Sequence, residues 1–470
     1  MSEGAMEHLL ARQQAAVERE PYPSAATRKD RIARALDATI ANQDRIIEAT
    51  RADFGRRPDL TAIAADLLYP VNALKHALKH VEAWMQVERR KADFPFGLLG
   101  ARARVFYQPL GVVGIMAPWN LPFALGYAPL AGVLAAGNRA MIKPSELTPN
   151  TSSLMAEITA ATFDAEEVAV VEGGVEAAAR FSALPFDHLI FTGGAPIARH
   201  VMRAAADHLT PVTLELGGKG PVVLAPGAKV ERLAGKILGI KLANAGQACI
   251  GLDHVWVHRS RLDAFVAAVK QKFAQYFPDY ATGPDTCDVF LPKQRARLAG
   301  LVDDAVARGV QVEVLGGSTT QGLADNAAFP LVLLIDPPRD CAAMRDEIFG
   351  PVLPILPYDH LDEVAAFVRS GERPLALYCF GATPAEQGFF LKHTWSGGVT
   401  FDDAMLHALM QDLPFGGVGH SGMGRYGGFA GFRTFSNAKS VAWAPRIDIM
   451  AMEPPYTAKM VATMRSLLKR

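Results

Sequence analysis

The sequence predicts an α/β protein built on two parallel sheets. From Gly111 onward, short apolar strands alternate with helices, which is the pattern of a parallel sheet with crossover helices. A second series of the same kind begins at Pro221. The chain has 470 residues, enough for two to four domains, and half of them are hydrophobic, so a large core can form.

The N-terminal part, residues 5 to 90, predicts mostly long helices. Apolar residues recur at helical spacing over 28–54 and 60–87, and Pro70 predicts a kink or a restart in the second run. Residues 101–109 then alternate as a strand does. Because helix breakers flank this strand and the sequence motifs lie far from it, we expect an arm or an edge strand.

The two α/β series follow in order. In the first, we expect strands at 111–116, 140–143, 168–171 and 188–191, with helices at 121–136 and 148–162. In the second, we expect strands at 222–224, 255–258, 352–356 and 376–380, and helices from 230, from 261 and over 294–307. Near the C-terminus, 432–442 is expected to pair with the arm strand.

Composition narrows the classes of partner. The 48 basic residues balance the 48 acidic ones, so no bulk field favours nucleic acid or a membrane. Four cysteines are too few for a disulfide scaffold and indicate a reducing compartment, hence the cytoplasm. No secretory signal or membrane-spanning run is present in the sequence. The amphipathic tail 458–470 is expected to pack on its own domain, with weak membrane association as the alternative.

Three side chains carry candidate chemistry. Cys249 lies among small residues in NAGQACIG, where a substrate can approach a thiolate nucleophile closely; a small buried core residue is the alternative. Glu215 ends an apolar strand before a glycine pair, as a general base or as an ion-pair partner of Lys219. Asn120 ends another strand, where its amide can stabilise an oxyanion or simply form a turn.

These residues and their contexts resemble the aldehyde dehydrogenase superfamily. Its motifs stand in the family's order as PWN, KPSE, FTG, LELGGK, GQxC, EIFGP and PFGG, and they span most of the chain. The closer resemblance is to the class 3 branch, which includes bacterial coniferyl aldehyde dehydrogenases. It rests on GQACIGLDHVWV, VVEGGVEAAARF and LPFGGVGHSGMGRYGGFAGFRTFS.

The resemblance implies two Rossmann-like parallel-sheet α/β domains and a β-strand oligomerisation arm. The cofactor-binding domain is expected at 1–100 and 110–215 and the catalytic domain at 216–410. The arm is expected at 101–109 and 430–445, followed by a tail at 446–470. Such an arm bridges two subunits, so a homodimer is expected.

The resemblance also assigns roles. Cys249 attacks an aldehyde to give a thiohemiacetal and then a thioester, Asn120 and the Cys249 backbone N–H hold the oxyanion, and Glu215 activates water. The cofactor is expected to be NAD, with NADP as the alternative, and no metal is needed. Its binding residues are expected to be Trp119, Lys143, Glu146, Gly193, Gly194, Glu347 and Phe349. Sequence alone leaves other readings open, such as Glu146 facing a helix dipole and Trp119 in the core.

The substrate pocket follows from the same comparison. By resemblance, its walls include Leu121, Ala243, Ala248, Phe401 and Leu406. Small or apolar residues at these positions predict a bulky uncharged aldehyde, with hydroxycinnamaldehydes first and medium-chain aliphatics second. The alternative is that the alanines, expected on a helix before Cys249, only pack that helix. Two other functions stay open, a CoA-acylating dehydrogenase and a non-enzymatic scaffold on the same fold.

Overall fold

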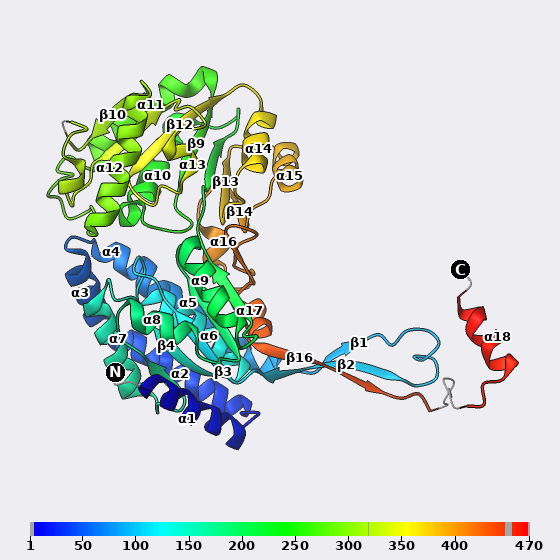
Figure 1. The fold of residues 1–470 in the computed structure, drawn as a ribbon. Helices are drawn as coiled ribbons and strands as arrows, with labels where there is room; N and C mark the ends of the chain where they lie inside the picture. The colour runs from blue at the N-terminus through cyan, green and yellow to red at the C-terminus, as the bar shows by residue number, and fades with distance from the viewer. Residues whose placement is uncertain (1–3, 318, 447–453, 469–470) are drawn as a thin grey trace.

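A computed structural model describes residues 4–317, 319–446 and 454–468. Two α/β lobes lie side by side, and a narrow β-ribbon projects from one of them (Figure 1). Over these described ranges, the strands form a six-stranded, a seven-stranded and a three-stranded sheet. The predicted fold class is confirmed.

The N-terminal segment is helical, as predicted, but with different breaks. The expected helix over 28–54 is divided at Asn42, whose side-chain amide donates to the Ala38 carbonyl at 2.9 Å. In the next run a π-helical turn precedes Pro70, which lies in the first turn of α5, where its missing N–H costs nothing. The elements are α1 Ala5–Arg19, α2 Ala25–Ala41, α3 Gln43–Phe54, α4 Asp59–Thr61, η1 Ala62–Leu67 and α5 Leu68–Trp84.

The six-stranded sheet belongs to the lobe that contains these helices. Its order is β15-β7-β6-β3-β4-β5, parallel except for β15. The strands are β3 Val112–Met116, β4 Arg139–Lys143, β5 Val168–Val170, β6 His188–Thr192, β7 Val212–Glu215 and β15 Gly422–Met423. Its helices are α6 Ala124–Ala136, α7 Pro149–Thr162, α8 Val175–Ser182 and α9 Ala195–Ala206.

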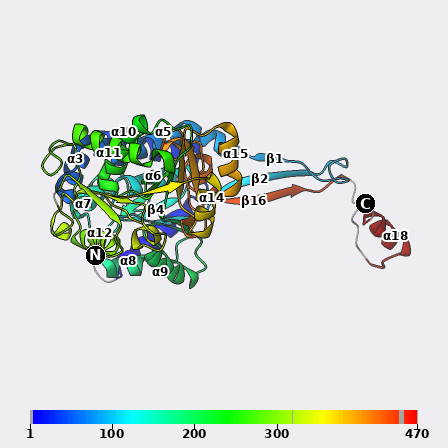
Figure 2. The same ribbon diagram turned by 90° about the horizontal axis from the view of Figure 1, so that it is seen from above.

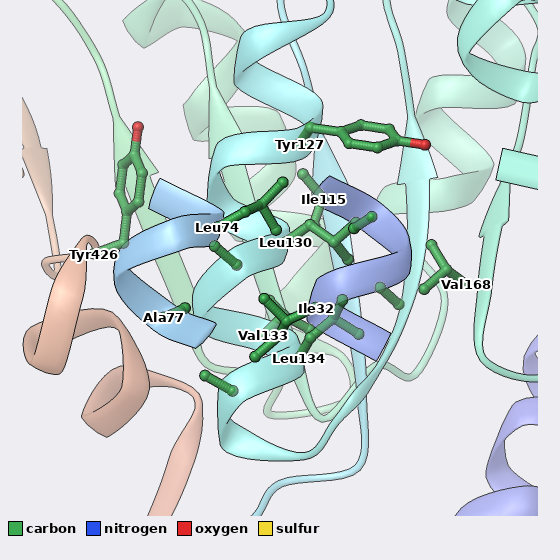
Figure 3. Close-up of a cluster of buried hydrophobic side chains, with 14 of the residues drawn as sticks. Ile32, Leu74, Ala77, Ile115, Tyr127, Leu130, Val133, Leu134, Val168 and Tyr426 are labelled. Carbon is green, nitrogen blue, oxygen red and sulfur yellow. The ribbon is translucent and has the colours of Figure 1, made fainter. Parts of the chain in front are cut away.

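Helix α6 lies at the centre of this lobe. Twelve of its 13 residues are buried, because α2 and α5 cover one side and the sheet covers the other. Figure 3 shows the side chains that meet around it, which are Ile32, Leu74, Ala77, Ile115, Tyr127, Leu130, Val133, Leu134, Val168 and Tyr426. An all-round apolar helix of this kind needs neighbours on every face, which explains the extra helical layer.

The second lobe carries the seven-stranded sheet, in the order β10-β11-β12-β9-β8-β13-β14, with only β10 antiparallel among these strands. The strands are β8 Pro221–Leu224, β9 His254–His258, β10 Gln311–Leu315, β11 Leu331–Ile335, β12 Val352–Tyr358, β13 Ala376–Phe380 and β14 Gly398–Phe401. The helices are α10 Val230–Leu242, η2 Ala243–Gly246, η3 Arg259–Arg261, α11 Leu262–Tyr276, α12 Pro292–Ala307, η4 Leu323–Asp325, α13 Ala342–Arg345, α14 Leu361–Ser370, α15 Pro384–His393 and α16 Leu406–Leu409.

After this lobe the chain returns to the first one. Strand β15 joins β7, and helix α17 Gly428–Thr434 packs on α5 and α6. The chain then enters the arm through β16 Ser436–Trp443, which pairs antiparallel with β2 Arg102–Pro109 from Ser436↔Pro109 to Trp443↔Arg102. The predicted pairing is confirmed for 436–442, whereas 432–434 belong to α17 and do not pair. Strand β1 Glu88–Arg90, which sequence reasoning missed, completes the ribbon.

The C-terminal tail does not lie where the sequence predicts. Helix α18 Ala458–Leu467 lies beyond the far end of the arm in both views, away from the lobes (Figures 1 and 2). The prediction that it packs on its own domain is therefore wrong, because the ribbon carries the chain outward before the tail begins. Residues 447–453 and 469–470 of the predicted tail lie outside the described residues. Within the described ranges, no helix combines the length and the apolar character needed to cross a bilayer.

Candidate active site

A cleft of about 580 Å³ opens between the two lobes. The first lobe contributes the ends of β3, β6 and β7 and the start of α9, and the second lobe contributes α12 and the loop before β12. Of the predicted site residues, eight line this cleft together: Trp119, Asn120, Gly193, Gly194, Glu215, Cys249, Glu347 and Phe349. The fold therefore brings together side chains from 119 to 349.

Cys249 lies in a tight loop rather than directly after a helix. Helix α10 ends at Leu242, and the next turn places Asn244 and Ala245 in the left-handed region, at φ of 52° and 53°. The expectation that Ala243 and Ala248 belong to a helix before the cysteine is wrong for this reason. The thiol is half-buried, and the other three cysteines are buried.

Asn120 follows β3 and meets the cysteine loop directly. Its side-chain Nδ2 donates to the Gln247 backbone carbonyl at 3.2 Å, and its backbone carbonyl accepts from Asn244 Nδ2 at 3.1 Å. A side-chain amide has two N–H donors, so one remains available after the bond to Gln247. Asn120 is buried, and its remaining donor is suited to a negatively charged oxygen formed next to Cys249.

Glu215 ends β7 and is buried without a hydrogen-bond partner at either carboxylate oxygen. The alternative of an ion pair with Lys219 is excluded, because Lys219 pairs with Asp253 and donates to the Ala343 carbonyl at 2.8 Å. Burial raises the pKa of Glu215 well above its ordinary value, and the charge of Arg425 offsets only part of that. A carboxyl group in this setting is suited to accept a proton from water.

Glu347 shares the cleft with Glu215. Its carboxylate occupies the space where a Cβ at Gly217 would be, so a side chain at 217 would require this carboxylate to move. Burial raises the pKa of Glu347 to about 7, while a hydrogen bond from the Gly218 backbone acts in the opposite direction. Phe349, at φ of 48°, packs edge-on against Trp119 with ring centroids 5.6 Å apart. Trp119 therefore lines the cleft and is only half-buried.

The electrostatics of the cleft hold Cys249 in its neutral form. Burial raises the pKa of the thiol to about 12, and the nearby Glu347 and Glu215 carboxylates add to that effect. Negative charges repel a thiolate, so the nucleophile needs a positive charge nearby to ionise at neutral pH. The arrangement fits a cationic ligand in the cleft.

The first turn of α9 is a second feature that fits a nucleotide. Gly194 is the N-cap of α9 and carries no side chain, so the first backbone N–H groups of a 12-residue helix face the cleft. Such a terminus favours phosphate oxygens, and Arg199 adds a positive charge on the same wall. This geometry agrees with the expectation for Gly193 and Gly194.

Lys143 and Glu146 do not line the cleft. Lys143 is buried, and its Nζ donates to the Pro144 carbonyl at 2.7 Å. Burial lowers the pKa of this ammonium group. Glu146 is exposed in a turn, and α7 begins only at Pro149, so Glu146 is not a helix-terminal residue. The roles of Lys143 and Glu146 as cofactor ligands therefore remain predictions.

The predicted substrate-pocket residues lie outside the cleft. Leu121, Ala248, Phe401 and Leu406 are half-buried, whereas Ala243 is exposed. Phe401 packs against the core of the second lobe. The roles of these five residues stay predictions.

Several cleft residues escaped the sequence analysis. Arg297 of α12 donates to the Glu347 carbonyl at 2.9 Å, and Arg345 and His420 also line the cleft. Tyr69 and Tyr426 meet with hydroxyls 3.2 Å apart in the vicinity of Glu215 and Cys249. Arg297 and Tyr69 come from segments without a short motif, so no local signal indicated them. His420 and Tyr426 lie inside LPFGGVGHSGMGRYGGFAGFRTFS, and Arg345 lies just before EIFGP, so these three could have been included. Asn244 and Gln247 stand inside the cysteine motif and could have been included.

Comparison with known proteins agrees with this geometry. Residues 3–441 match the Aldehyde dehydrogenase family. The chain belongs to that family and is an oxidoreductase. A coniferyl aldehyde dehydrogenase of Pseudomonas sp. (strain HR199) is 45% identical over 438 residues, which cover 91% of this chain and 89% of that one.

Solved structures show the same fold. The substrate-bound state of Staphylococcus aureus AldH has a TM-score of 0.89 and 32% identity, and the match covers 100% of both chains. A Mycobacterium tuberculosis aldehyde dehydrogenase complexed with NAD+ has a TM-score of 0.83 and 27% identity, with 94% of this chain and 90% of that one covered.

The buried Glu215 carboxyl predicts a pH-dependent stability. Its pKa is raised in the folded state, so stability is lost as pH rises from the unfolded value, about 4.3, through the folded value. Glu215→Gln removes this loss. We expect the melting temperature of the variant to exceed that of the wild type, by an amount that grows from pH 5 to pH 8.

The measurement is thermal unfolding at several pH values, with Glu48→Gln on the exposed surface of α3 as the control. The control should give a difference independent of pH. If Glu215→Gln were less stable than the wild type at pH 8, the claim that Glu215 is buried without a stabilising partner would be wrong.

Proposed function

We propose that the protein oxidises an apolar or aromatic aldehyde to the carboxylic acid, with Cys249 as the nucleophile and Glu215 as the base that activates water. The observation that carries this is the shared cleft of a half-buried thiol and an unpartnered buried carboxylate. Membership of the family supports the same reaction.

In the proposed reaction, the Cys249 thiol first loses its proton to solvent. The thiolate sulfur then forms a bond to the aldehyde carbon, the carbonyl π bond breaks, and the oxygen becomes an oxyanion. The free N–H of the Asn120 amide and the Cys249 backbone N–H hold that oxygen; losing one such donor typically costs about 3 kcal/mol. Loss of hydride converts the adduct to a thioester. Glu215 then removes a proton from water, the hydroxide attacks the thioester carbon, and the carbon–sulfur bond breaks.

We propose NAD as the cofactor, with NADP as the alternative. When bound, the oxidised nicotinamide supplies a hydride acceptor and a positive charge. That charge suits a cleft where two carboxyl groups oppose ionisation of Cys249. Glu347 and the start of α9 would hold the ribose and phosphate groups, and the M. tuberculosis relative complexed with NAD+ supports this choice.

The roles of Cys249 and Glu215 can be separated by one pair of variants. Cys249→Ala should lose aldehyde oxidation by more than 1,000-fold, on the order expected for removal of a nucleophile, while NADH still binds. Glu215→Gln should release about one NADH per active site in a burst and then turn over slowly, because only deacylation needs the base. Stopped-flow absorbance at 340 nm measures both. Steady turnover of Glu215→Gln at the wild-type rate would exclude Glu215 as the base.

We further propose that the substrate is bulky and uncharged, with hydroxycinnamaldehydes such as coniferyl aldehyde first. The 45% identical relative is a coniferyl aldehyde dehydrogenase, which supports this class. An anionic aldehyde is disfavoured beside the thiol, because burial there already opposes ionisation of the Glu215 and Glu347 carboxyl groups. Leu121 next to Asn120 leaves more room than a larger aromatic side chain would.

The substrate proposal predicts a ranking of kcat/KM. Coniferyl aldehyde should exceed acetaldehyde and a carboxylate-bearing semialdehyde by roughly 10-fold or more, because each buried methylene is worth about 0.8 kcal/mol. Leu121→Tyr should lower kcat/KM for coniferyl aldehyde more than for acetaldehyde, which serves as the internal control. A clear preference of the wild type for the small or the anionic substrate would overturn the proposal.

We propose a homodimer assembled through the arm formed by β1, β2 and β16. The ribbon extends away from both lobes, and Trp443 near its end is 38% exposed, as expected of a surface that meets another subunit (Figure 2). We place the protein in the cytoplasm, which its four free cysteines support.

Light scattering at micromolar concentration should give a mass near twice that of the 50.5 kDa chain. A monomer would contradict the proposed role of the arm. A tetramer would keep the arm and correct the number of subunits.

A further inference from the structure

A buried ion pair lies next to the cysteine loop, away from the cleft itself. Arg57 Nη2 and Asp66 Oδ2 are 2.6 Å apart, and both side chains are fully buried. The Arg57 guanidinium also covers the Phe54 ring, 4.4 Å from its centroid. Two charges removed from water in this way carry a desolvation cost, so their retention calls for a reason beyond stability.

Asp66 connects the pair to the segment that carries Asn120. It lies in η1, the π-helical turn, and its Oδ1 accepts from the Phe123 and Ala124 backbone N–H groups at 3.2 Å each. These are the first N–H groups of α6, where a carboxylate is favourable. The bonds hold the start of α6 only three residues after Asn120.

Arg57 connects the pair to the loop that carries Cys249. Its Nε donates to Asn244 Oδ1 at 3.1 Å. The Asn244 amide then donates to the Asn120 carbonyl at 3.1 Å and to the Gln247 carbonyl at 3.0 Å. Every polar atom of the Asn244 side chain is thus used, and asparagine is among the few residues that tolerate its left-handed backbone.

We propose that the Arg57–Asp66 pair positions the two oxyanion donors through Asn244. The chain of contacts runs from Asp66 and Arg57 to Asn244, and from Asn244 to both Asn120 and the loop that presents the Cys249 backbone N–H. Arg57, Asp66 and Asn244 are positioning residues, since they act through other groups. This inference rests on the proposed roles of Asn120 and Cys249.

Two substitutions at Asn244 separate side-chain positioning from the backbone turn. Asn244→Asp keeps the shape and the acceptor for Arg57, but turns an oxygen toward the Asn120 and Gln247 carbonyls. Asn244→Gly keeps the left-handed turn and removes the side chain. Both should lower the rate constant of the first hydride release by at least 10-fold. If Asn244 only supports the turn, Asn244→Gly should retain the parent rate constant.

The experiment uses the Glu215→Gln background with saturating coniferyl aldehyde and NAD, where stopped-flow absorbance gives a burst amplitude and a burst rate constant. The amplitude counts competent active sites, and the rate constant reports the chemistry in each of them. Positioning predicts a lower rate constant with an amplitude that stays near one per site. A purely structural role predicts a lower amplitude with an unchanged rate constant, which would overturn the inference.

Asp66→Asn tests the ion pair itself, with Glu167→Gln as the matched control. Glu167 accepts from Arg31 at 2.8 Å beside β5, at the opposite edge of the six-stranded sheet from β7. Both variants remove the charge of a carboxylate that pairs with an arginine, but only Asp66→Asn should lower the burst rate constant. In the double variant with Asn244→Asp, Asp66→Asn should lower the burst rate constant by a smaller factor than it does alone. The reason is that both substitutions interrupt the same chain of contacts. If the decrease in the double variant equalled the product of the two single decreases, the substitutions would act independently, which would contradict a shared chain of contacts.

Different results would contradict the proposed function and the positioning inference. If Glu215→Gln shows no burst and Cys249→Ala stays active, the roles of the site residues are wrong. If that pair behaves as expected while both Asn244 variants keep the parent burst rate constant, only the positioning inference is wrong.

Discussion

The contact between Arg57 and Asp66 ties the helical N-terminal segment to the two loops at the mouth of the cleft. Asp66 Oδ1 accepts from the start of α6, and Arg57 Nε donates to Asn244, in addition to the ion pair itself. A π-helical turn, which is rare, brings Asp66 into line with both partners. The first lobe therefore contacts directly, through Arg57 and Asn120, a loop that belongs to the other lobe.

Burial governs the chemistry of the cleft. The surrounding protein buries the thiol and the two carboxyl groups, so the pKa values of all three rise. Glu215 keeps both oxygens unpartnered, while the neighbouring Lys219 is held by Asp253 and cannot neutralise it. Glycines at 217 and 416 leave room for the two carboxylates, since a Cβ at Gly416 would lie 2.8 Å from Glu215 Oε1. Burial thus opposes ionisation of all three groups, and a positively charged ligand in the cleft would favour it.

The arm and the tail follow a different principle from the lobes. The ribbon of β1, β2 and β16 has a hydrogen-bonded backbone but little core of its own, since most of β16 is exposed. Cation–π contacts between Arg102, Arg104 and Trp443 hold its outer part together. A ribbon of this kind gains stability when a second surface covers it, which agrees with the dimer proposed above.

The sequence by itself determined the α/β alternation, the pairing of 436–442 with the arm strand, and the candidates Cys249, Glu215 and Asn120, which line one cleft. Short periodic patterns and motifs carry that information locally. Only the tertiary structure decided that α10 stops at Leu242, that Asn244 turns left-handed and that Lys219 faces Asp253. Arg57, Asp66, Tyr69 and Tyr426 reach the site from segments more than 140 residues away from Cys249 along the chain. Their roles depend on which buried polar groups meet after packing, and no local pattern specifies that.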